Sequence, residues 1–306
     1  MGGAKGDRAV LLMAYGTPDR LEDVEAYFTH IRGGRTPSPE SVANLRQRYA
    51  RVGGGTPLLQ ITEEVRRRLE AELAAAGAPQ RVYLGMKHWH PYIAQTLQTM
   101  RDDGARAVTA VALAPHYSRL SIGGYRKAVD EKMAELGSPF ELRFVDHWYG
   151  EPRFVQFVAE LVRQGLMQFP VGDRAGVTVV FTAHSLPERI RTWSDPYEAQ
   201  LQASAELVAR EAGLPGFRRA WQSAGGTGEP WIGPDILDYL DTLHAEGVRD
   251  VLQVPIGFVS DHLEVLYDID IEAKDKARAL GMTLHRTELP NAKPEFIRVL
   301  AGVVTR

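Results

Sequence analysis

The sequence predicts an α/β protein with two similar domains, each built on a four-stranded, mainly parallel sheet flanked by helices. Short apolar, β-branched runs alternate with longer helical patterns along the chain, which is typical of βαβ units. The 306 residues exceed the roughly 100–200 residues of one ordinary domain. Four expected strands precede Gly150 and four follow it. We therefore expect an N-terminal domain of residues 1–150 and a C-terminal domain of residues 151–306.

In the first half, the expected strands are short apolar runs, too short for helices and bounded by turn residues. They are Ala9–Ala14, Arg81–Met86, Ala107–Ala114 and Phe140–Val145. Longer stretches with apolar residues at helical spacing separate them. These predict helices over Glu22–Thr29, Pro39–Arg51, Gln60–Ala76, Tyr92–Asp103 and Tyr125–Leu136.

The second half repeats this alternation. Its expected strands are Val177–Ala183, Phe217–Gln222, Asp250–Pro255 and Thr283–Thr287. The helices expected with them are Arg153–Met167, Asp195–Glu211, Asp235–Glu246 and Asp261–Leu280. A final helix over Lys293–Val304 is free to pack back on either domain.

The two halves also resemble each other at the ends of their strands. In each half a buried strand runs into a small residue, a polar ring and a turn containing proline, with Tyr15 and His184 as the ring residues. Ligands of open α/β sheets bind outside the carboxyl ends of the strands. Tyr15, His116, His184 and the segment after Pro255 are therefore candidates to face one cleft, whose shape suits a flat ligand.

Composition limits the partners. A net charge of −3 and a pI near 6.3 give no basic field for nucleic acid or an anionic membrane. An anionic ligand would need local arginines, which cluster early in the chain at Arg32, Arg35, Arg46 and Arg48. The glycines at 53–55 and at 225, 226 and 228 form neither a P-loop nor a dinucleotide fingerprint.

The chain contains no cysteine, which excludes disulfides, thiolate nucleophiles and a cysteine-ligated iron–sulfur cluster. Residues 1–8 do not resemble a secretory signal, and no apolar run approaches the roughly 18 residues of a transmembrane helix. We expect a cytoplasmic protein without stable membrane insertion.

Three carboxylates in the predicted helix over Asp261–Leu280 recur at i+4 spacing: Glu264, Asp268 and Glu272. Like charges at this spacing destabilise a helix by roughly 0.2–0.5 kcal/mol per pair. One interpretation is structural, with Asp261 and Glu264 forming a capping box and Glu272 pairing with Lys276. The other is a functional row of oxygen ligands and proton acceptors. Spacing alone does not decide between them.

Imidazole side chains are the other candidates. His184 ends an apolar strand, and its ring suits both Fe²⁺ ligation and proton transfer near neutral pH, although a hydrogen-bonded structural histidine is the commoner case. Tyr15 has the same structural alternative. His88 and His90 flank Trp89, a spacing that on a strand places both rings on one face; we favour a structural or supporting role for them.

Several short motifs lie along almost the whole chain: Met13–Pro18, Tyr27–Arg32, Pro57–Leu58, Leu113–Ser118, Ala183–Pro187, Trp221–Ser223, Trp231–Pro234, Asp261–Asp268 and Pro290–Asn291. Together they resemble the ferrochelatases, and most closely the short, soluble bacterial form that lacks an iron–sulfur cluster and acts on coproporphyrin III. The resemblance implies two Rossmann-like domains of the class II chelatase type. It also implies a lyase-type enzyme that inserts Fe²⁺ into a porphyrin in haem biosynthesis.

The resemblance further implies roles for individual residues. His184 and Glu264 would bind the iron and remove pyrrole protons, with Asp268 and Glu272 as an outer acidic path. Tyr15 would face the other side of the porphyrin as an axial ligand, and His88 and His262 would support the site. The propionates would be held by Arg32, Arg48, Tyr49, Thr56 and Tyr125.

Fe²⁺ and the porphyrin would then be substrates, with no tightly bound cofactor, and a transient partner would receive the product. We expect a monomer. Other interpretations remain open: a chelatase that inserts Co²⁺ or Ni²⁺ into another tetrapyrrole, or a carrier that binds porphyrin without catalysis. A two-domain binding protein for sugars or amino acids is less favoured, since no secretory signal is visible.

Overall fold

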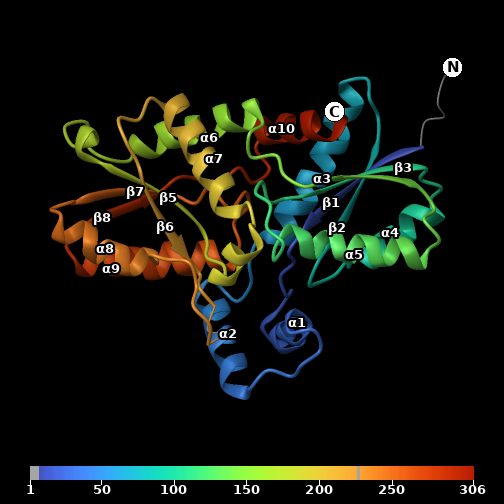
Figure 1. Cartoon of the computed structure of the whole chain (residues 1–306), viewed down its shortest axis with the longest axis horizontal. Coiled ribbons are helices and arrows are strands. Elements are labelled where there is room, and N and C mark those ends of the chain that lie inside the picture. Colours follow the sequence, from blue (N-terminus) through green and yellow to red (C-terminus); the bar gives the residue numbers. More distant parts are fainter. Residues whose placement is uncertain (1–6, 226–227) are drawn as a thin grey trace.

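The computed structural model describes residues 7–225 and 228–306, so Gly226 of the second glycine-rich segment lies outside the described residues. Two four-stranded sheets form the framework, with strand orders β2-β1-β3-β4 and β6-β5-β7-β8. The pairs of neighbouring strands in both sheets are parallel. The predicted fold class is therefore confirmed, and the two halves have the same topology (Figure 1).

The first sheet is covered by helices on both faces. Along β1, Val10 and Leu12 pack with helix α3, whereas Leu11 and Met13 pack with α4 and α5. This burial on both sides explains why the strand reads as an unbroken apolar run. The elements of this half are β1 (Arg8–Ala14), η1 (Leu21–Asp23), α1 (Val24–Ile31), α2 (Pro39–Arg51), α3 (Leu58–Ala75), β2 (Arg81–Met86), α4 (Ile93–Asp102), β3 (Ala107–Ala112), α5 (Ile122–Glu135) and β4 (Glu141–Val145).

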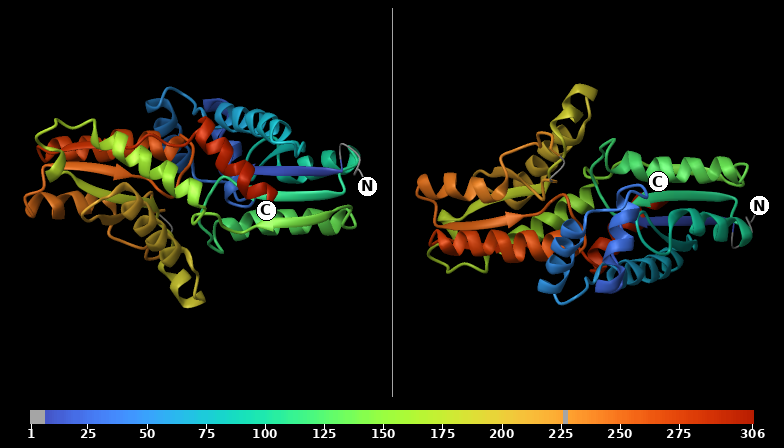
Figure 2. Two further views of the ribbon diagram at one scale, coloured as in Figure 1. Left: turned by 90° about the horizontal axis from the view of Figure 1, so that it is seen from above. Right: turned by 90° about the horizontal axis from the view of Figure 1, so that it is seen from below.

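The second sheet has the same layering (Figure 2). Val179 and Phe181 of β5 belong to the core with α6 and α7, and Val180 faces α8 and α9. The elements are α6 (Pro152–Leu166), η2 (Arg174–Gly176), β5 (Thr178–His184), η3 (Glu188–Trp193), α7 (Tyr197–Ala212), β6 (Arg218–Gln222), α8 (Ile236–Ala245), β7 (Asp250–Val254), η4 (Val265–Ala273), α9 (Lys274–Ala279), β8 (Thr283–Arg286) and α10 (Pro294–Thr305).

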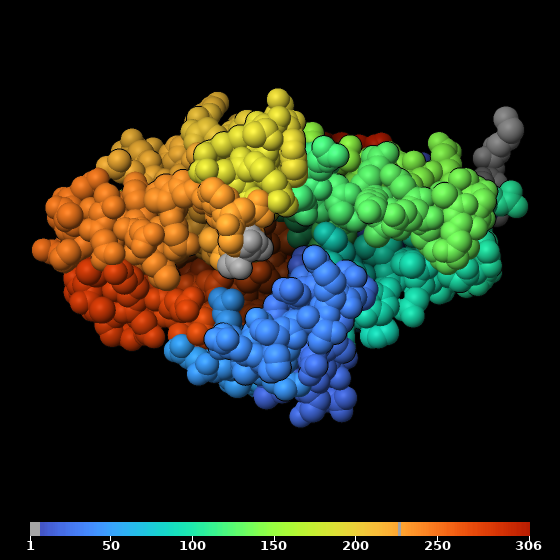
Figure 3. All heavy atoms as spheres, turned by 60° about the horizontal axis from the view of Figure 1, so that its bottom comes forward, coloured from blue at the N-terminus to red at the C-terminus, as the bar shows by residue number. Residues whose placement is uncertain are grey.

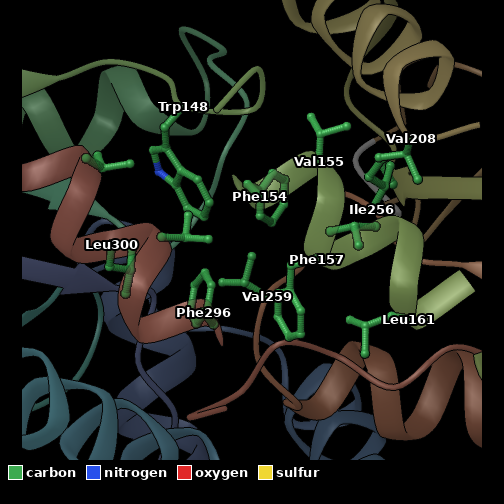
Figure 4. Close-up of a cluster of buried hydrophobic side chains, with 14 of the residues drawn as sticks. Trp148, Phe154, Val155, Phe157, Leu161, Val208, Ile256, Val259, Phe296 and Leu300 are labelled. Carbon is green, nitrogen blue, oxygen red and sulfur yellow. The ribbon is translucent and has the colours of Figure 1, made fainter. Parts of the chain in front are cut away.

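One hydrophobic cluster joins the two halves (Figure 4). Trp148, at the end of the first half, packs edge-on against Phe154 of α6, with ring centroids 4.9 Å apart, and also lies 5.9 Å from Phe296 of α10. Helix α10 contacts both α3 and α6. The segment around Gly150 therefore crosses a shared core rather than a solvated linker.

Helices α1 and α2 form an excursion between β1 and α3 that stands away from the first sheet (Figure 1). It is held by a small apolar cluster in which Val24 and Tyr49 of the excursion contact Leu263 and Tyr267 of the second half. The excursion therefore brings residues of the first half against the segment that carries Glu264.

The segment Asp261–Leu280 is helical, as expected, but it is not a single α-helix. Its central part, Val265–Ala273, is a π-helix, η4, followed by the short α-helix α9. Over only two turns, an α-helix with i→i+4 hydrogen bonds and a π-helix with i→i+5 hydrogen bonds give similar spacings of apolar residues. The sequence pattern therefore could not reveal the π-helix. π-helical turns are rare and occur often at functional sites.

Smaller deviations have local causes. Strand β3 ends at Ala112, two residues before the expected end, and Pro115 beyond it has no N–H to donate. Helix α5 begins at Ile122, three residues earlier than expected, and includes Gly124, where a Cβ would collide with the Lys87 side chain. The 3₁₀ helices η2 and η3 were not expected. Among the described residues, no helix is both long and apolar enough to cross a membrane.

Candidate active site

The molecule is hollowed between the excursion, the segment near residue 200 and the segment near residue 260 (Figure 3). Tyr15 follows β1, and its side chain is 41% exposed. Surrounding protein nevertheless desolvates its hydroxyl and raises its pKa above the ordinary value, with a further contribution from the charge of Glu264. The Tyr15 ring is thus accessible to solvent and yet surrounded by protein, as expected for a side chain that lines a recess.

His184 ends β5 with its ring partly accessible. Its Nδ1 bonds the carbonyl oxygen of Ser185, which assigns the Nδ1 hydrogen as donor. The other nitrogen, Nε2, lies 3.4 Å from Oε1 of Glu264. In the neutral ring this Nε2 carries the lone pair that can take a proton or bind a metal.

Glu264 lies between two imidazoles. Its Oε2 is 3.4 Å from Nε2 of His262, whose Nδ1 donates to the carbonyl of Ser260 at 2.9 Å. Burial, the largest single effect, would lower the pKa of His184, but the charge and hydrogen bond of Glu264, together with the bond to Ser185 and the charge of Asp268, outweigh burial and raise that pKa to about 9. Burial likewise opposes ionisation of Glu264, and the two imidazoles more than offset it, so its pKa is lowered. Near pH 7 the pair is an imidazolium and a carboxylate.

Asp268 lies next along the same side of η4 and is 5% exposed. Ser223 donates to one of its oxygens and Arg48 to the other, and Arg48 Nη2 is 3.9 Å from Glu272. Burial, and the charges of Glu264 and Glu272, outweigh Arg48 and raise the pKa of Asp268 to about 6. The three predicted carboxylates are thus electrostatic neighbours.

The two structural contacts expected for this segment are not formed among the described residues. Asp261 does not cap a helix; its carboxylate bonds Arg286 at 3.0 Å and Asn291 at 2.7 Å. Lys276 pairs with Asp241 at 2.8 Å, and Glu272 lies against Arg48 instead.

Several predicted porphyrin contacts lie around Tyr15. The hydroxyls of Tyr49, Thr17 and Thr56 form a chain, with distances of 3.2 Å and 2.9 Å. Tyr125 is buried, and the Lys87 ammonium lies 5.1 Å from its ring and 6.0 Å from the ring of Tyr15.

The two predicted arginines differ. Arg32 ends α1 at the surface, with its guanidinium 5.8 Å from the ring of Phe28. Arg48 is turned toward η4, where it also lies 4.4 Å from the ring of Tyr267. Arg48 is therefore engaged with carboxylates, whereas Arg32 has no carboxylate partner within the described part of the chain.

Two histidine predictions need correction. His88 and His90 are not on a strand, because β2 ends at Met86 and the chain turns. His88 Nδ1 lies 3.2 Å from His30 Nδ1, and its ring lies 4.6 Å from Tyr15, so it supports Tyr15 without pairing with His90. His116 does not line the cleft: it is buried and stacked on Tyr149 at 5.6 Å.

A family model described as Ferrochelatase matches residues 7–306. The chain belongs to the ferrochelatase family. It is 51% identical over 298 residues to a ferrochelatase of Herpetosiphon aurantiacus, with 97% of this chain and 98% of the relative covered. Coproporphyrin III ferrochelatases of Anoxybacillus flavithermus and Bacillus subtilis are 44% and 42% identical, covering 96% and 97% of this chain and 94% and 96% of the relatives.

The fold agrees with this family. The chain is similar to the sirohydrochlorin chelatase SirB of Bacillus subtilis subspecies spizizenii in complex with cobalt, with a TM-score of 0.57, 11% identity, and 98% and 94% of the two chains covered. It also resembles SirB of Bacillus subtilis with Fe³⁺, with a TM-score of 0.60, 11% identity and the same coverage. The two halves thus share the fold of these chelatases, and as a member of the ferrochelatase family the protein is a lyase-type metal chelatase.

Three residues near the candidate site were missed as individual candidates. Ser223 bonds Asp268, Tyr197 donates to the carbonyl of His184 at 3.1 Å, and Lys87 lies between Tyr15 and Tyr125. Ser223 belongs to a motif that carried the family resemblance and could have been found. Nothing in the sequence near Lys87 or Tyr197 marks them, since only tertiary packing brings them to the site.

Proposed function

We propose that this ferrochelatase inserts Fe²⁺ into coproporphyrin III, giving iron coproporphyrin. Relatives named coproporphyrin III ferrochelatase that are 41–44% identical over nearly the whole chain support this substrate. The grouping of hydroxyls and cations around Tyr15 also suits a porphyrin rich in carboxylates.

The observation that carries the proposal is the placement of Glu264 between His184 and His262 at the wall of the cleft. As the metal enters, a porphyrin loses its pyrrole N–H protons, so the site needs a base and a temporary metal ligand. Once His184 has released its proton, His184 Nε2 and Glu264 Oε1, 3.4 Å apart, can bind one cation between them or accept protons in turn. Fe²⁺ is a substrate here, and no tightly bound cofactor is needed for this chemistry.

Asp268 and Glu272 would extend this pair outward. They continue the acidic row along η4 and offer oxygen atoms to cations or protons. Arg48 now covers both carboxylates, so a cation would have to compete with it. We assign Tyr15 to the opposite face of the porphyrin as axial ligand, with His88 and His262 supporting the site.

We assign the propionates of coproporphyrin III to Arg32, Arg48, Tyr49, Thr56 and Tyr125. A guanidinium binds carboxylate through paired N–H groups, and hydroxyls add single bonds. We further propose that the enzyme is a cytoplasmic monomer that passes its product to a transient partner. Size-exclusion chromatography with light scattering tests the oligomeric state.

An anaerobic assay with purified protein tests the proposal. Fe²⁺ is added to coproporphyrin III or, separately, to protoporphyrin IX, and loss of the metal-free absorption spectrum is followed. We expect turnover with both, with a higher kcat/KM for coproporphyrin III. A higher kcat/KM for protoporphyrin IX would overturn the substrate assignment. Insertion of Co²⁺ or Ni²⁺ but not Fe²⁺ would indicate another chelatase, and tight porphyrin binding with no insertion would indicate a carrier.

A further inference from the structure

Three buried polar side chains form a layer across the middle of the second sheet. Thr182 of β5 is 1% exposed, and Gln222 of β6 and Gln253 of β7 are fully buried. Thr182 Oγ1 donates to Gln222 Oε1 at 2.7 Å, and Gln253 Nε2 donates to Thr182 Oγ1 at 3.0 Å and to Gln222 Oε1 at 3.2 Å. We call these three residues the amide layer.

The described part of the protein does not itself satisfy every polar atom of the amide layer. Gln222 Nε2 and Gln253 Oε1 have no partner among the described residues, and a buried amide group without a partner is costly. Two residues earlier on each strand, the same face carries Val180, Ala220 and Val251, which belong to an apolar cluster. Apolar side chains would therefore suit the layer equally well for packing.

The position of the layer suggests why polar groups are present. His184 is two residues beyond Thr182 and is aligned with Gln222 in the strand register. The main-chain carbonyl of Gln222 accepts from N of Ser185 at 2.7 Å, and Ser185 is also the residue whose carbonyl accepts from the His184 ring. The layer therefore lies directly beneath His184.

The residue that follows Gln222, Ser223, is also a hydrogen-bond donor to Asp268. Ser223 follows Gln222 with a φ of 62°, in the left-handed region that is unfavourable for serine, and from there its hydroxyl reaches Asp268. Gly257, after β7, bonds the carbonyl of Thr182 at 3.4 Å, and this segment leads to Glu264. Main-chain bonds thus join the strand ends that carry the site, and the side-chain bonds of the amide layer link the same three strands.

We propose that Thr182, Gln222 and Gln253 are positioning residues for the metal-insertion site. They fix the three strand ends laterally, so that His184, Glu264 and Asp268 keep the separation needed to bind a metal ion. Hydrogen bonds set distances and angles, which apolar contacts of the same volume do not. This inference rests on the proposed function and adds residues that do not touch substrate.

The test uses a triple variant, Thr182→Val, Gln222→Met and Gln253→Met, which removes every polar group of the layer at similar volume. We expect its urea unfolding midpoint to equal or exceed that of the wild type, because no polar group is left unpaired. A small displacement of reacting groups is costly, so kcat should fall at least about tenfold, while KM for the porphyrin changes less than about twofold. The affinity of the metal-free protein for Zn²⁺, used alone as probe, should fall by about 10-fold or more.

Two matched variants separate positioning from folding. Thr182→Ser keeps the hydroxyl and should retain kcat. Thr96→Val removes a buried hydroxyl from the first half, where Thr96 donates to the carbonyl of Leu84 at 2.8 Å, and should lower stability without changing kcat.

Wild-type kcat and Zn²⁺ affinity in the triple variant would overturn the inference, as would a kcat that falls only in proportion to lost stability. If the triple variant fails to fold, the single variants Thr182→Val and Thr182→Ser replace it. Their kcat and Zn²⁺ affinity are then compared at equal folded fraction, and equal values would overturn the inference. Failure of the wild-type protein to insert any divalent metal would instead overturn the proposed function, and Zn²⁺ affinity would still report on the layer.

Discussion

At the scale of single residues, Glu264 affects the pKa of several groups of the cleft. It lies 3.4 Å from both His184 and His262 and contributes to raising the pKa values of His184 and Tyr15. Glu264 and Asp268 share one side of η4, yet they differ: the pKa of Glu264 is lowered by its imidazoles, and that of Asp268 is raised to about 6 by burial. When their environments shift the pKa values of two carboxylates in opposite directions, the two groups suit different tasks in proton and metal transfer.

His184→Ala should reduce Fe²⁺ insertion by at least about 100-fold, because both a proton acceptor and a metal ligand are removed. Porphyrin affinity, measured by fluorescence titration, should remain nearly unchanged. His244→Ala is the matched control, since His244 is at the opposite end of the second sheet, near the start of β7. Near-normal initial rates in His184→Ala would remove this residue from the mechanism.

Glu272→Gln should slow turnover less than Glu264→Gln. Glu264 lies between the two imidazoles, whereas Glu272 is 40% exposed and lies 3.9 Å from Nη2 of Arg48. Initial rates at saturating porphyrin and varied Fe²⁺ would measure the difference. Equal or reversed effects would contradict the proposed order of the acidic path.

Stability should depend on pH through the His184–Glu264 pair. The pKa of His184 is raised from 6.5 to about 9, so the stabilisation is fully present below about pH 6.5 and is lost as the pH rises toward 9. Glu264→Gln should therefore lower the free energy of unfolding at pH 6, by on the order of 2 kcal/mol, and do so much less at pH 9.5. Urea titrations of both proteins at the two pH values measure this, and a pH-independent difference would contradict the ion pair.

At the scale of elements, the π-helix η4 shapes the site. Arg286 of β8 lies against it, with its guanidinium 2.8 Å from Asp270 and 3.0 Å from Asp261. On the other side, Arg48 and Arg51 of α2 lie 4.4 Å and 5.2 Å from the ring of Tyr267. A π-helix is rare because its geometry is intrinsically unfavourable. The tertiary contacts of Arg286, Arg48 and Arg51 therefore help to stabilise the wide turns of η4.

Asp270→Asn should destabilise the protein by about 1–3 kcal/mol at pH 7, because the buried Arg286 loses a charged partner. The pKa of Asp270 is lowered chiefly by its bonds to Arg286 and Lys274, against the effect of burial. This contribution is therefore present above the unfolded-state pKa and is lost as the pH falls below it. Asp275→Asn, in an exposed pair, should change stability by less than about 0.5 kcal/mol. Equal effects of the two variants would contradict the structural role of Arg286.

At the scale of the whole molecule, the two halves form one packed body. The largest apolar cluster contains residues of β1, α3, α6, β5 and α10, so neither half has its complete core alone. This continuity fixes the distance across the cleft between Tyr15 and His184. A ligand site between two domains gains rigidity when the domains share a core.

Phe296→Ala should therefore destabilise both halves together. Phe296 is fully buried beside Trp148, and deleting such a ring costs about 3–5 kcal/mol. Urea unfolding followed by tryptophan fluorescence and by far-UV circular dichroism should show one transition shifted equally in both signals. Val171→Ala, at an exposed site, is the control. Separate transitions for the two signals would contradict a shared core.

Sequence alone determined the alternation of strands and helices, because period-2 and period-3.6 apolar patterns and buried parallel strands are local properties. It also selected His184 and Glu264 through motifs, although spacing could not say that they face each other. The π-helix, the pairing of Arg48 with Asp268, the burial of His116 and the amide layer were decided only by the tertiary structure. Each depends on contacts between residues distant in sequence, whose energies have no counterpart in a local pattern.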